Sequence, residues 1–210
     1  MLEVKQEMSF DDLKNNCWSG AVDTLEAIEK AGLEGIFMDY LEQIFCEETP
    51  TMTDVNDVIW FDDYINNDFI NENKTLDDVE SLEELKEYAN NSDVYDVLDT
   101  AINSAYANDL WEYITESYMG DSLATVFDEL TSLEPNDYIS FDSIKSLSEF
   151  IELTKDNDTV MEVINAIKEA NLTDEYWNRL EEECKGINYT VANVVEDIES
   201  LDVDELIESL

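Results

Sequence analysis

Histidine is absent from this chain, and glycine occurs five times. Without histidine there is no imidazole general base, no histidine-containing triad and no histidine-ligated metal. The few glycines form neither a Walker pattern nor a GxGxxG pattern, so no phosphate-binding loop is expected. The run Asp156-Asn157-Asp158 starts like a calcium loop but lacks the glycine required at its sixth position. We therefore predict no catalytic residues, no metal site, no cofactor and no enzymatic activity.

Cysteine is scarce as well: Cys17, Cys46 and Cys184 are odd in number and far apart. This spacing argues against a disulfide framework and for a reducing cytoplasm. Each cysteine lies on or near an apolar helix face, so we expect all three to be small core residues. No run of about 18 apolar residues occurs, and the start MLEVKQEMSF lacks the basic and apolar regions of a signal peptide. A cytoplasmic location without a membrane-spanning segment is expected.

Basic residues are few compared with acidic ones. Ten lysines and arginines face 54 aspartates and glutamates, which gives a formal charge of −44, and Arg179 is the single arginine. The chain is nevertheless 44% hydrophobic and 10% aromatic, which is enough to bury a core. A surface this acidic is repelled by anionic lipids and by nucleic acid. We expect no direct nucleic-acid binding and no membrane binding, and we expect basic proteins as partners.

One sequence pattern recurs along the chain. Ser81–Ile102 (SLEELKEYANNSDVYDVLDTAI) and Ser146–Ile167 (SLSEFIELTKDNDTVMEVINAI) agree at seven of 22 positions, and most apolar positions stay apolar. A fainter copy begins at Ser9–Leu13 and continues in Ala27–Ala31. We predict a mostly α-helical protein, an elongated array of three related helical modules covering residues 1–72, 73–137 and 138–210. Short strands at the module starts are compatible with the pattern.

Apolar residues at helical spacing define most of the expected helices. Phe37, Tyr40, Leu41, Ile44 and Phe45 follow an i, i+3, i+4, i+7, i+8 pattern, which is typical of an amphipathic helix. Ser9 is expected to cap a helix over residues 9–16, and Thr53 or Asp54 another one. Residues 58–61 (VIWF) are ambiguous between helix and strand, and residues 138–141 are a second candidate strand. The polar run 66–74 (NNDFINENK) is the expected first module boundary, and the tryptophans at positions 60, 111 and 177 are expected in the core.

The acids are clustered. With 54 of them, close carboxylate pairs arise by chance and do not indicate general acid–base chemistry. Glu80, Glu83, Glu84 and Glu87 have helical spacing and should project from one helix face as a ridge. The residues that we expect to bind the partner are Asp62, Asp63, Glu72, Asp77, Asp78, Glu80, Glu83, Glu84, Glu87, Glu181, Glu182, Glu183, Glu196, Asp197, Glu199, Asp202, Asp204, Glu205 and Glu208.

The charge density suggests a use for these acids. Duplex DNA carries about one negative charge per 1.7 Å of axis, so 44 charges at that density span roughly 75 Å. Three helical modules of about 25 Å each, stacked end to end, have the same length. The hypothesis is a DNA mimic whose carboxylates take the place of phosphates in a basic groove. The alternatives are an acidic adaptor or chaperone-like protein for another basic partner, and an unspecialised acidic surface such as high-salt adaptation produces.

Two stretches of the sequence resemble a known family. Tyr138–Ile144 (YISFDSI) followed by Leu147–Leu153 (LSEFIEL) is similar to a segment of the antirestriction proteins of phages and conjugative elements, and Leu76–Ala89 is a second echo. Residues 18–24 (WSGAVDT) with residues 56–61 (NDVIWF) resemble small acidic proteins of mobile elements. The strand-rich N-terminal module usual in antirestriction proteins is not recognisable here.

The resemblance implies an elongated acidic DNA mimic that blocks type I restriction-modification enzymes. A phage-encoded inhibitor of another DNA-handling system, such as a CRISPR nuclease (an anti-CRISPR protein), is equally compatible. The expected partner is a basic DNA-binding protein of a bacterial defence system, met in the cytoplasm of the host cell. A homodimer is compatible with the sequence.

Overall fold

The computed structural model describes residues 7–47 and 49–210. Within these residues the chain forms sixteen α-helices and two short 3-10 helices, and its β-structure consists of two isolated bridges. The prediction of a mostly α-helical protein is therefore confirmed. The chain divides into two compact units: Met1–Asp96 with Tyr118–Glu129, and Val97–Ser117 with Leu130–Leu210. The elongated array of three modules and its boundaries stay a prediction.

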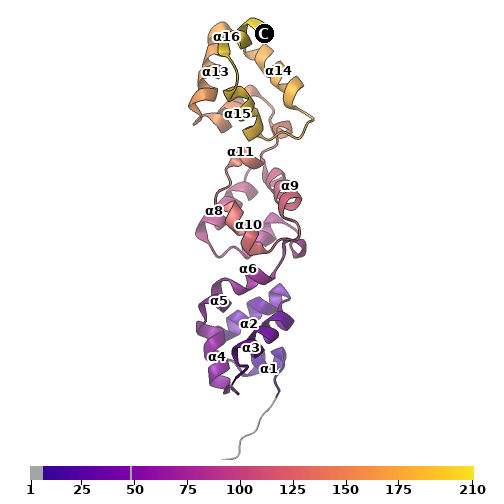
Figure 1. Ribbon diagram of the computed structural model, residues 1–210, viewed down its shortest axis with the longest axis vertical. Coiled ribbons are helices and arrows are strands. Elements are labelled where there is room, and N and C mark those ends of the chain that lie inside the picture. Colours follow the sequence, from indigo (N-terminus) through magenta and orange to yellow (C-terminus); the bar gives the residue numbers. More distant parts are fainter. Residues whose placement is uncertain (1–6, 48) are drawn as a thin grey trace, which may run out of the picture. The chain divides into compact units, whose positions relative to one another are not determined.

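Unit 1 is built on four helices that pack around one another (Figure 1). They are α1 (Phe10–Asn16), α2 (Gly20–Ala31), α3 (Glu34–Ile44) and α4 (Met52–Phe61). Leu25, Ile28, Phe37 and Ile59 are fully buried between them. The unit continues with α5 (Asp63–Asn67), α6 (Phe69–Asn73), the 3-10 helix η1 (Leu76–Asp78), α7 (Leu82–Glu87), the first half of α8 (Ser92–Ile102) and most of α10 (Leu123–Leu130). This core fixes the positions of the surface acids.

The ambiguous segment of unit 1 is helical, and the cap predicted for it at Thr53 or Asp54 is wrong. The run Val58–Phe61 lies in helix α4, because Val55 and Ile59, four residues apart, bury one helix face against α2. The cap of that helix is Thr51, whose hydroxyl accepts from the Asp54 N–H (3.2 Å). Residues 66–74, where we predict the first module boundary, are largely helical, and α5 and α6 turn Phe69 into the core.

The cap predicted at Ser9 is confirmed. Its hydroxyl accepts from the Asp12 N–H (3.2 Å), while the Asp12 carboxylate accepts from the Ser9 N–H (2.9 Å). This reciprocal arrangement satisfies two backbone donors at the helix start. The carboxylate accepts from the Ser9 N–H and also from the Ser9 hydroxyl (2.8 Å), and these two hydrogen bonds lower the pKa of the Asp12 carboxyl group. Some surface acids therefore stabilise the ends of helices.

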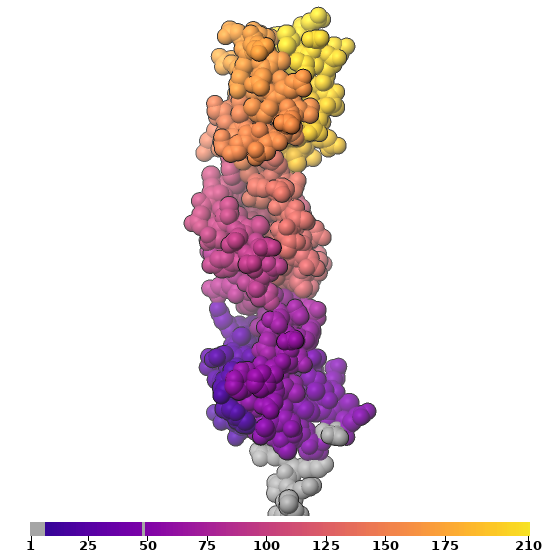
Figure 2. Space-filling model, turned by 90° about the vertical axis from the view of Figure 1, so that its left-hand side faces the viewer, coloured from indigo at the N-terminus to yellow at the C-terminus, as the bar shows by residue number. Residues whose placement is uncertain are grey.

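Unit 2 is centred on one helix, α13 (Asp158–Ala170), which buries Val160, Val163, Ile164 and Ile167. Helices α12 (Leu147–Thr154), α14 (Thr173–Cys184), α15 (Val191–Glu199) and α16 (Val203–Ser209) pack against it. In Figure 2 the last helices of the chain, in yellow, lie against the orange helices that precede them. The remaining elements of the unit are the second half of α8, most of α9 (Ala107–Tyr118), α11 (Pro135–Tyr138) and the 3-10 helix η2 (Phe141–Ser143).

In each unit, two backbone hydrogen bonds join segments that are far apart in the sequence, and we call this arrangement a clasp. In unit 1 the Leu76 N–H donates to the Asp121 carbonyl (3.0 Å) and the Leu123 N–H to the Lys74 carbonyl (2.9 Å), around a bridge between residues 75 and 122. In unit 2 the Phe141 N–H donates to the Tyr189 carbonyl (2.8 Å). The Val191 N–H likewise donates to the Ile139 carbonyl (2.8 Å), around a bridge between residues 140 and 190. The strands considered near residues 138–141 are thus reduced to a single bridge.

The same local structure follows each clasp. A 3-10 helix, η1 or η2, leads into a serine N-cap, Ser81 or Ser146, whose side chain accepts from the backbone N–H three residues later. The carboxylate of that third residue, Glu84 or Glu149, accepts from the backbone N–H just before the cap, at 2.9 and 2.8 Å respectively. The two stretches of similar sequence therefore make equivalent hydrogen bonds.

Candidate partner-binding surface

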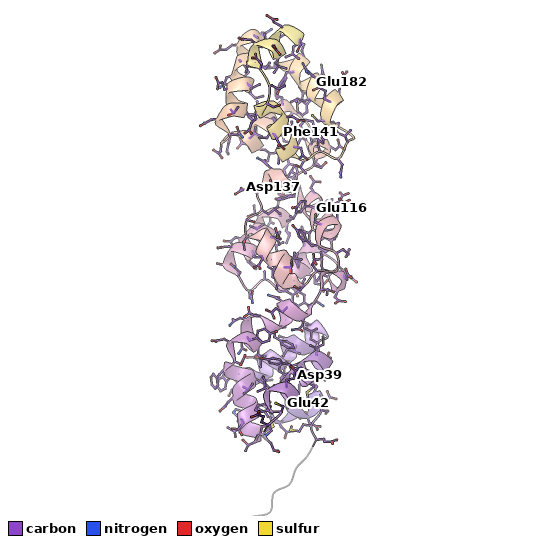
Figure 3. All side chains as sticks on the ribbon, in the orientation of Figure 1. Asp39, Glu42, Glu116, Asp137, Phe141 and Glu182 are labelled. Carbon is purple, nitrogen blue, oxygen red and sulfur yellow. The ribbon has the colours of Figure 1, made fainter. Side chains whose placement is uncertain are left out.

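Most of the acids that we expected to bind a partner are exposed. Sixteen of the nineteen are exposed to solvent, and Asp62, Glu84 and Glu181 are half-buried. A carboxylate that is exposed on a folded helix faces solvent from a defined position. Figure 3 shows this for Glu182 of α14, which points away from unit 2, whereas Phe141 lies inside.

One group of seven predicted acids covers two helices. Glu196, Asp197 and Glu199 lie on α15, and four further acids lie at or on α16, all in the exposed class. Asp202 caps α16 by accepting from two backbone N–H groups at 3.0 and 3.1 Å. Glu199 accepts from the Asn157 side chain (2.9 Å). This cluster is the densest acidic surface in unit 2 among the predicted residues.

The ridge expected from Glu80, Glu83, Glu84 and Glu87 does not form as predicted. Helix α7 has six residues, so Glu80 lies before its cap and outside the helix. Glu84 turns back to accept from the Glu80 N–H, and Glu87 forms an ion pair with Lys30 of α2. The sequence spacing suggested one helix face, but the cap at Ser81 interrupts it.

Several other predicted acids form hydrogen bonds that stabilise the local structure. Asp62 accepts from the Ile65 N–H (3.1 Å) and so caps α5, and Glu72 accepts from the Tyr64 hydroxyl (2.8 Å). Asp78 accepts from the Thr75 hydroxyl (3.2 Å). Asp63, Asp77 and Glu83 are exposed on the same unit. The predicted set therefore contains both structural acids and acids that face solvent.

The basic residues neutralise little of this charge. Glu183 accepts from Arg179 (2.9 Å), and Glu181 accepts from Lys185 (2.7 Å). Together with Glu87, which pairs with Lys30, these are three predicted acids that form ion pairs. Lys74 is buried in unit 1, where its ammonium group lies 5.3 Å from the Tyr88 ring centre. A few cations of this kind leave most of the 54 acids uncompensated.

An aromatic surface in unit 1 joins the two segments that resemble small acidic proteins. The Trp18 N–H donates to the side-chain oxygen of Asn56 (2.8 Å), and Gly20 lies directly against the Trp60 indole. Phe61 stacks on Trp60, with ring centres 4.6 Å apart. All three aromatic side chains are exposed, Phe61 by 63%. The expectation that Trp60 belongs to the core is therefore wrong, whereas Trp111 and Trp177 are half-buried.

The cysteines differ from one another. Cys184 is buried, which raises the pKa of its thiol to about 11. Cys17 is half-buried and Cys46 is exposed, so the prediction that all three are core residues is wrong for Cys46. Cys46 lies outside the helix, directly after the Phe45 C-cap of α3.

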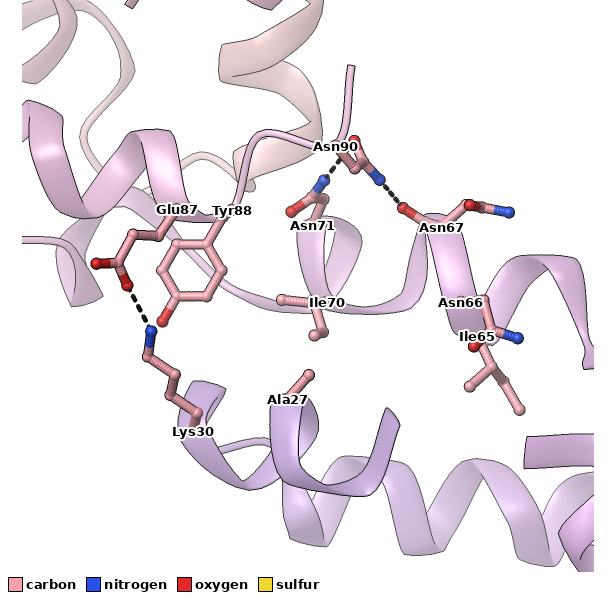
Figure 4. Close-up of a pocket in the computed structure, with 10 residues that line it drawn as sticks. All are labelled: Ala27, Lys30, Ile65, Asn66, Asn67, Ile70, Asn71, Glu87, Tyr88 and Asn90. Carbon is pink, nitrogen blue, oxygen red and sulfur yellow. Dashed lines mark hydrogen bonds and ion pairs between the residues drawn. The ribbon is translucent and has the colours of Figure 1, made fainter. Parts of the chain in front are cut away.

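A cavity of about 270 Å³ in unit 1 is lined by asparagines and by the Lys30–Glu87 ion pair (Figure 4). Asn71 donates to the Asn90 side chain, and Asn90 donates to the Asn67 carbonyl, so these amides partner one another. The described residues contain no group of acids or cysteines that could hold a metal ion, and Asn157 of the calcium-like run caps α13. Among the same residues, no helix is long and apolar enough to cross a membrane.

A further acidic site was not predicted from the sequence. Asp109, Glu112 and Glu116 lie on one face of α9 and line a cavity of about 120 Å³ in unit 2 together with three tyrosines. Their i, i+3, i+7 spacing with a tyrosine at position 113 was visible in the sequence, but the opposite wall comes from residues far along the chain.

No protein-family model matches this chain, and neither a curated protein nor a solved structure matches it.

Proposed function

We propose that this chain is an acidic DNA-mimic inhibitor, of the kind that a phage or mobile element encodes against a host defence enzyme. It would occupy the DNA-binding surface of a basic partner, such as a restriction-modification enzyme or a CRISPR nuclease, and compete with DNA. The proposed target is in the bacterial cytoplasm. The protein would act by stoichiometric binding and not by catalysis.

One observation carries the proposal: most of the predicted carboxylates are exposed on capped, well-packed helices and are not neutralised by basic residues. Self-repulsion of this size destabilises a compact protein. A buried core that holds the acids in place despite this cost supports a use for the electric field. Fixed carboxylates attract a basic groove over several ångströms and fill the sites of phosphates with little loss of side-chain freedom.

The test is displacement of DNA from a defined target. A type I restriction-modification enzyme and a CRISPR nuclease are each loaded with a fluorescent duplex, and the anisotropy is followed as the chain is added. We expect stoichiometric release of the duplex at low salt and a steep loss of competition as salt rises, since exposed charges are screened within about 8 Å at physiological ionic strength. An enzyme that binds the chain and keeps its DNA would indicate the acidic adaptor instead. Absence of both binding and release would refute inhibition of these enzymes.

Two variants with equal charge changes locate the binding surface. The first neutralises four exposed acids of α15 and α16, and the second neutralises four exposed acids of α2 and α3 outside the predicted set. We expect the first to compete much more weakly and the second to stay close to the unmodified chain. Equal loss in both would show that overall charge, and not this surface, drives binding. The substitutions are E196Q, D197N, D204N and E208Q in the first variant, and D23N, E26Q, D39N and E42Q in the second.

A further inference from the structure

The cavity beside α9 combines negative charge with aromatic walls. Its volume is about 120 Å³, and it lies in unit 2 between α9 and the loop that leads into the clasp at residues 188–190. No lysine or arginine lines it. The six side chains that matter are the acids Asp109, Glu112 and Glu116 and the tyrosines Tyr113, Tyr138 and Tyr189.

The geometry of the acids is partly fixed. Asp109 accepts from the Ser140 N–H (3.3 Å) and from the Ser143 hydroxyl (2.9 Å), which hold its carboxylate against the clasp. Glu112 and Glu116 follow at one and two further helical turns and are exposed. Figure 3 shows Glu116 at the edge of α9, pointing outward. The cavity therefore has one carboxylate held by hydrogen bonds and two exposed ones.

Tyr138 supplies an independent sign of a ligand. This residue is 8% exposed and lines the cavity, and within residues 7–47 and 49–210 its hydroxyl has no hydrogen-bond partner. The hydroxyl oxygen itself is not shut off from solvent, so it is open to the cavity that the side chain lines. Burial, together with the nearby Asp109 carboxylate, raises the pKa of Tyr138, so the hydroxyl stays protonated at neutral pH. Its oxygen is available to accept a hydrogen bond from a donor that enters the cavity.

The donor set selects the class of ligand. Over residues 7–47 and 49–210, no group of three acids or cysteines is arranged to hold a metal ion, so the cavity does not suit a small divalent cation. A guanidinium group is planar, carries five N–H donors, pairs with carboxylates and stacks on aromatic rings. We propose that this cavity binds the guanidinium group of an arginine side chain. This inference rests on the proposed function only for the source of the arginine, which would be the basic partner.

A second acidic surface in the same unit provides a natural comparison. Asp158, Glu162 and Glu169 line an open depression on α13, but no tyrosine lines it. Carboxylates alone attract any cation, whereas rings and an unpartnered hydroxyl favour a flat group with directed donors. The cavity on α9 should therefore prefer arginine to lysine, and the depression on α13 should not.

The test titrates the full chain with L-argininamide and with L-lysinamide at low salt, followed by backbone amide shifts in NMR. We expect shifts confined to α9 and residues 138–140 and 188–190, with argininamide bound several-fold more tightly. The variant E112Q/E116Q should weaken binding roughly tenfold, as two exposed ion contacts imply. The control E162Q/E169Q removes the same charge on α13 and should leave binding unchanged.

A third variant, Tyr138→Phe, removes only the hydroxyl oxygen. Because that hydroxyl has no partner in the unit, the fold should be retained, which circular dichroism checks, while argininamide affinity should fall by about tenfold. Shifts spread evenly over the acidic surface, or equal weakening by both glutamine pairs, would overturn the proposal. Argininamide binding without DNA displacement would leave the cavity assigned and reject the DNA mimic. DNA displacement with no localised argininamide binding would do the reverse.

Discussion

Replacement of Gly20 by alanine should destabilise unit 1 through the Trp60 indole. A Cβ atom at position 20 would lie 2.2 Å from the indole nitrogen and 2.4 Å from the neighbouring ring carbon. Ordinary contacts begin near 3.4 Å, so the ring would have to move by more than about 1 Å. That movement separates Trp60 from Phe61, whose ring it stacks on at 4.6 Å.

The magnitude follows from the contacts that are lost. An aromatic pair contributes about 0.5–1.5 kcal/mol beyond its buried area, and re-exposing about 50 Å² of ring costs about 1.3 kcal/mol more. Alanine regains up to about 1 kcal/mol of helix propensity at the start of α2. The net loss expected for Gly20→Ala is therefore about 1–2 kcal/mol.

The assay is a double-mutant cycle in urea. Unfolding midpoints are measured by circular dichroism for the unmodified chain, Gly20→Ala, Trp60→Ala and the double variant. With the indole removed, Gly20→Ala should be neutral or stabilising, which gives a coupling free energy of about 2 kcal/mol between the two positions. A cycle without coupling would refute the reasoning, because it would show that the ring moves aside at no cost.

Three further predictions concern single side chains. Lys74→Met removes a buried ammonium group that donates to the last carbonyl of α2 (3.4 Å), and it should lower the free energy of unfolding by about 1–3 kcal/mol in urea titrations. The hydrogen bond from the Tyr106 hydroxyl (2.6 Å) lowers the pKa of Glu149, so its contribution is present above the pKa of an unfolded glutamate and is lost as pH falls through the folded value. The stability difference between the unmodified chain and Glu149→Gln should thus be constant from about pH 5.5 to 8 and shrink below about pH 4; a constant difference at pH 3 would contradict this. Cys46 should react with a thiol reagent long before Cys184, whose thiol is buried with a pKa of about 11, and mass spectrometry of the labelled peptides would expose the opposite order.

Much of the fold followed from local patterns. Helical apolar spacing identified α2, α3 and α13, and Ser9 was recognisable as a cap because an acid stands three residues after it. The helix over Val58–Phe61 was ambiguous, since an apolar run of four fits a strand or a helix until its neighbours are known. The two short helices within residues 66–74 were not expected, because polar side chains outnumber the apolar ones that anchor these helices.

The surface was less predictable than the core. Composition alone indicated exposed acids, and sixteen of the nineteen chosen residues are exposed. Which acids are occupied by caps and ion pairs depends on where helices begin, as Glu84 and Asp62 show. The cavity at Asp109 required the approach of Tyr138 and Tyr189, which no spacing along α9 encodes.

The two clasps are made from main-chain groups alone, and this has a bearing on how such a surface can change. A hydrogen bond between an N–H and a carbonyl is indifferent to the side chain attached, proline apart. A substitution at Asp121 or Tyr189, which take part through their carbonyl groups and are not buried, can therefore leave the closure in place, whereas the donors Leu76, Leu123, Phe141 and Val191 are also core residues. Because the closures depend on the backbone, exposed acids elsewhere on each unit can be gained or lost while the main-chain hydrogen bonds that close it stay the same.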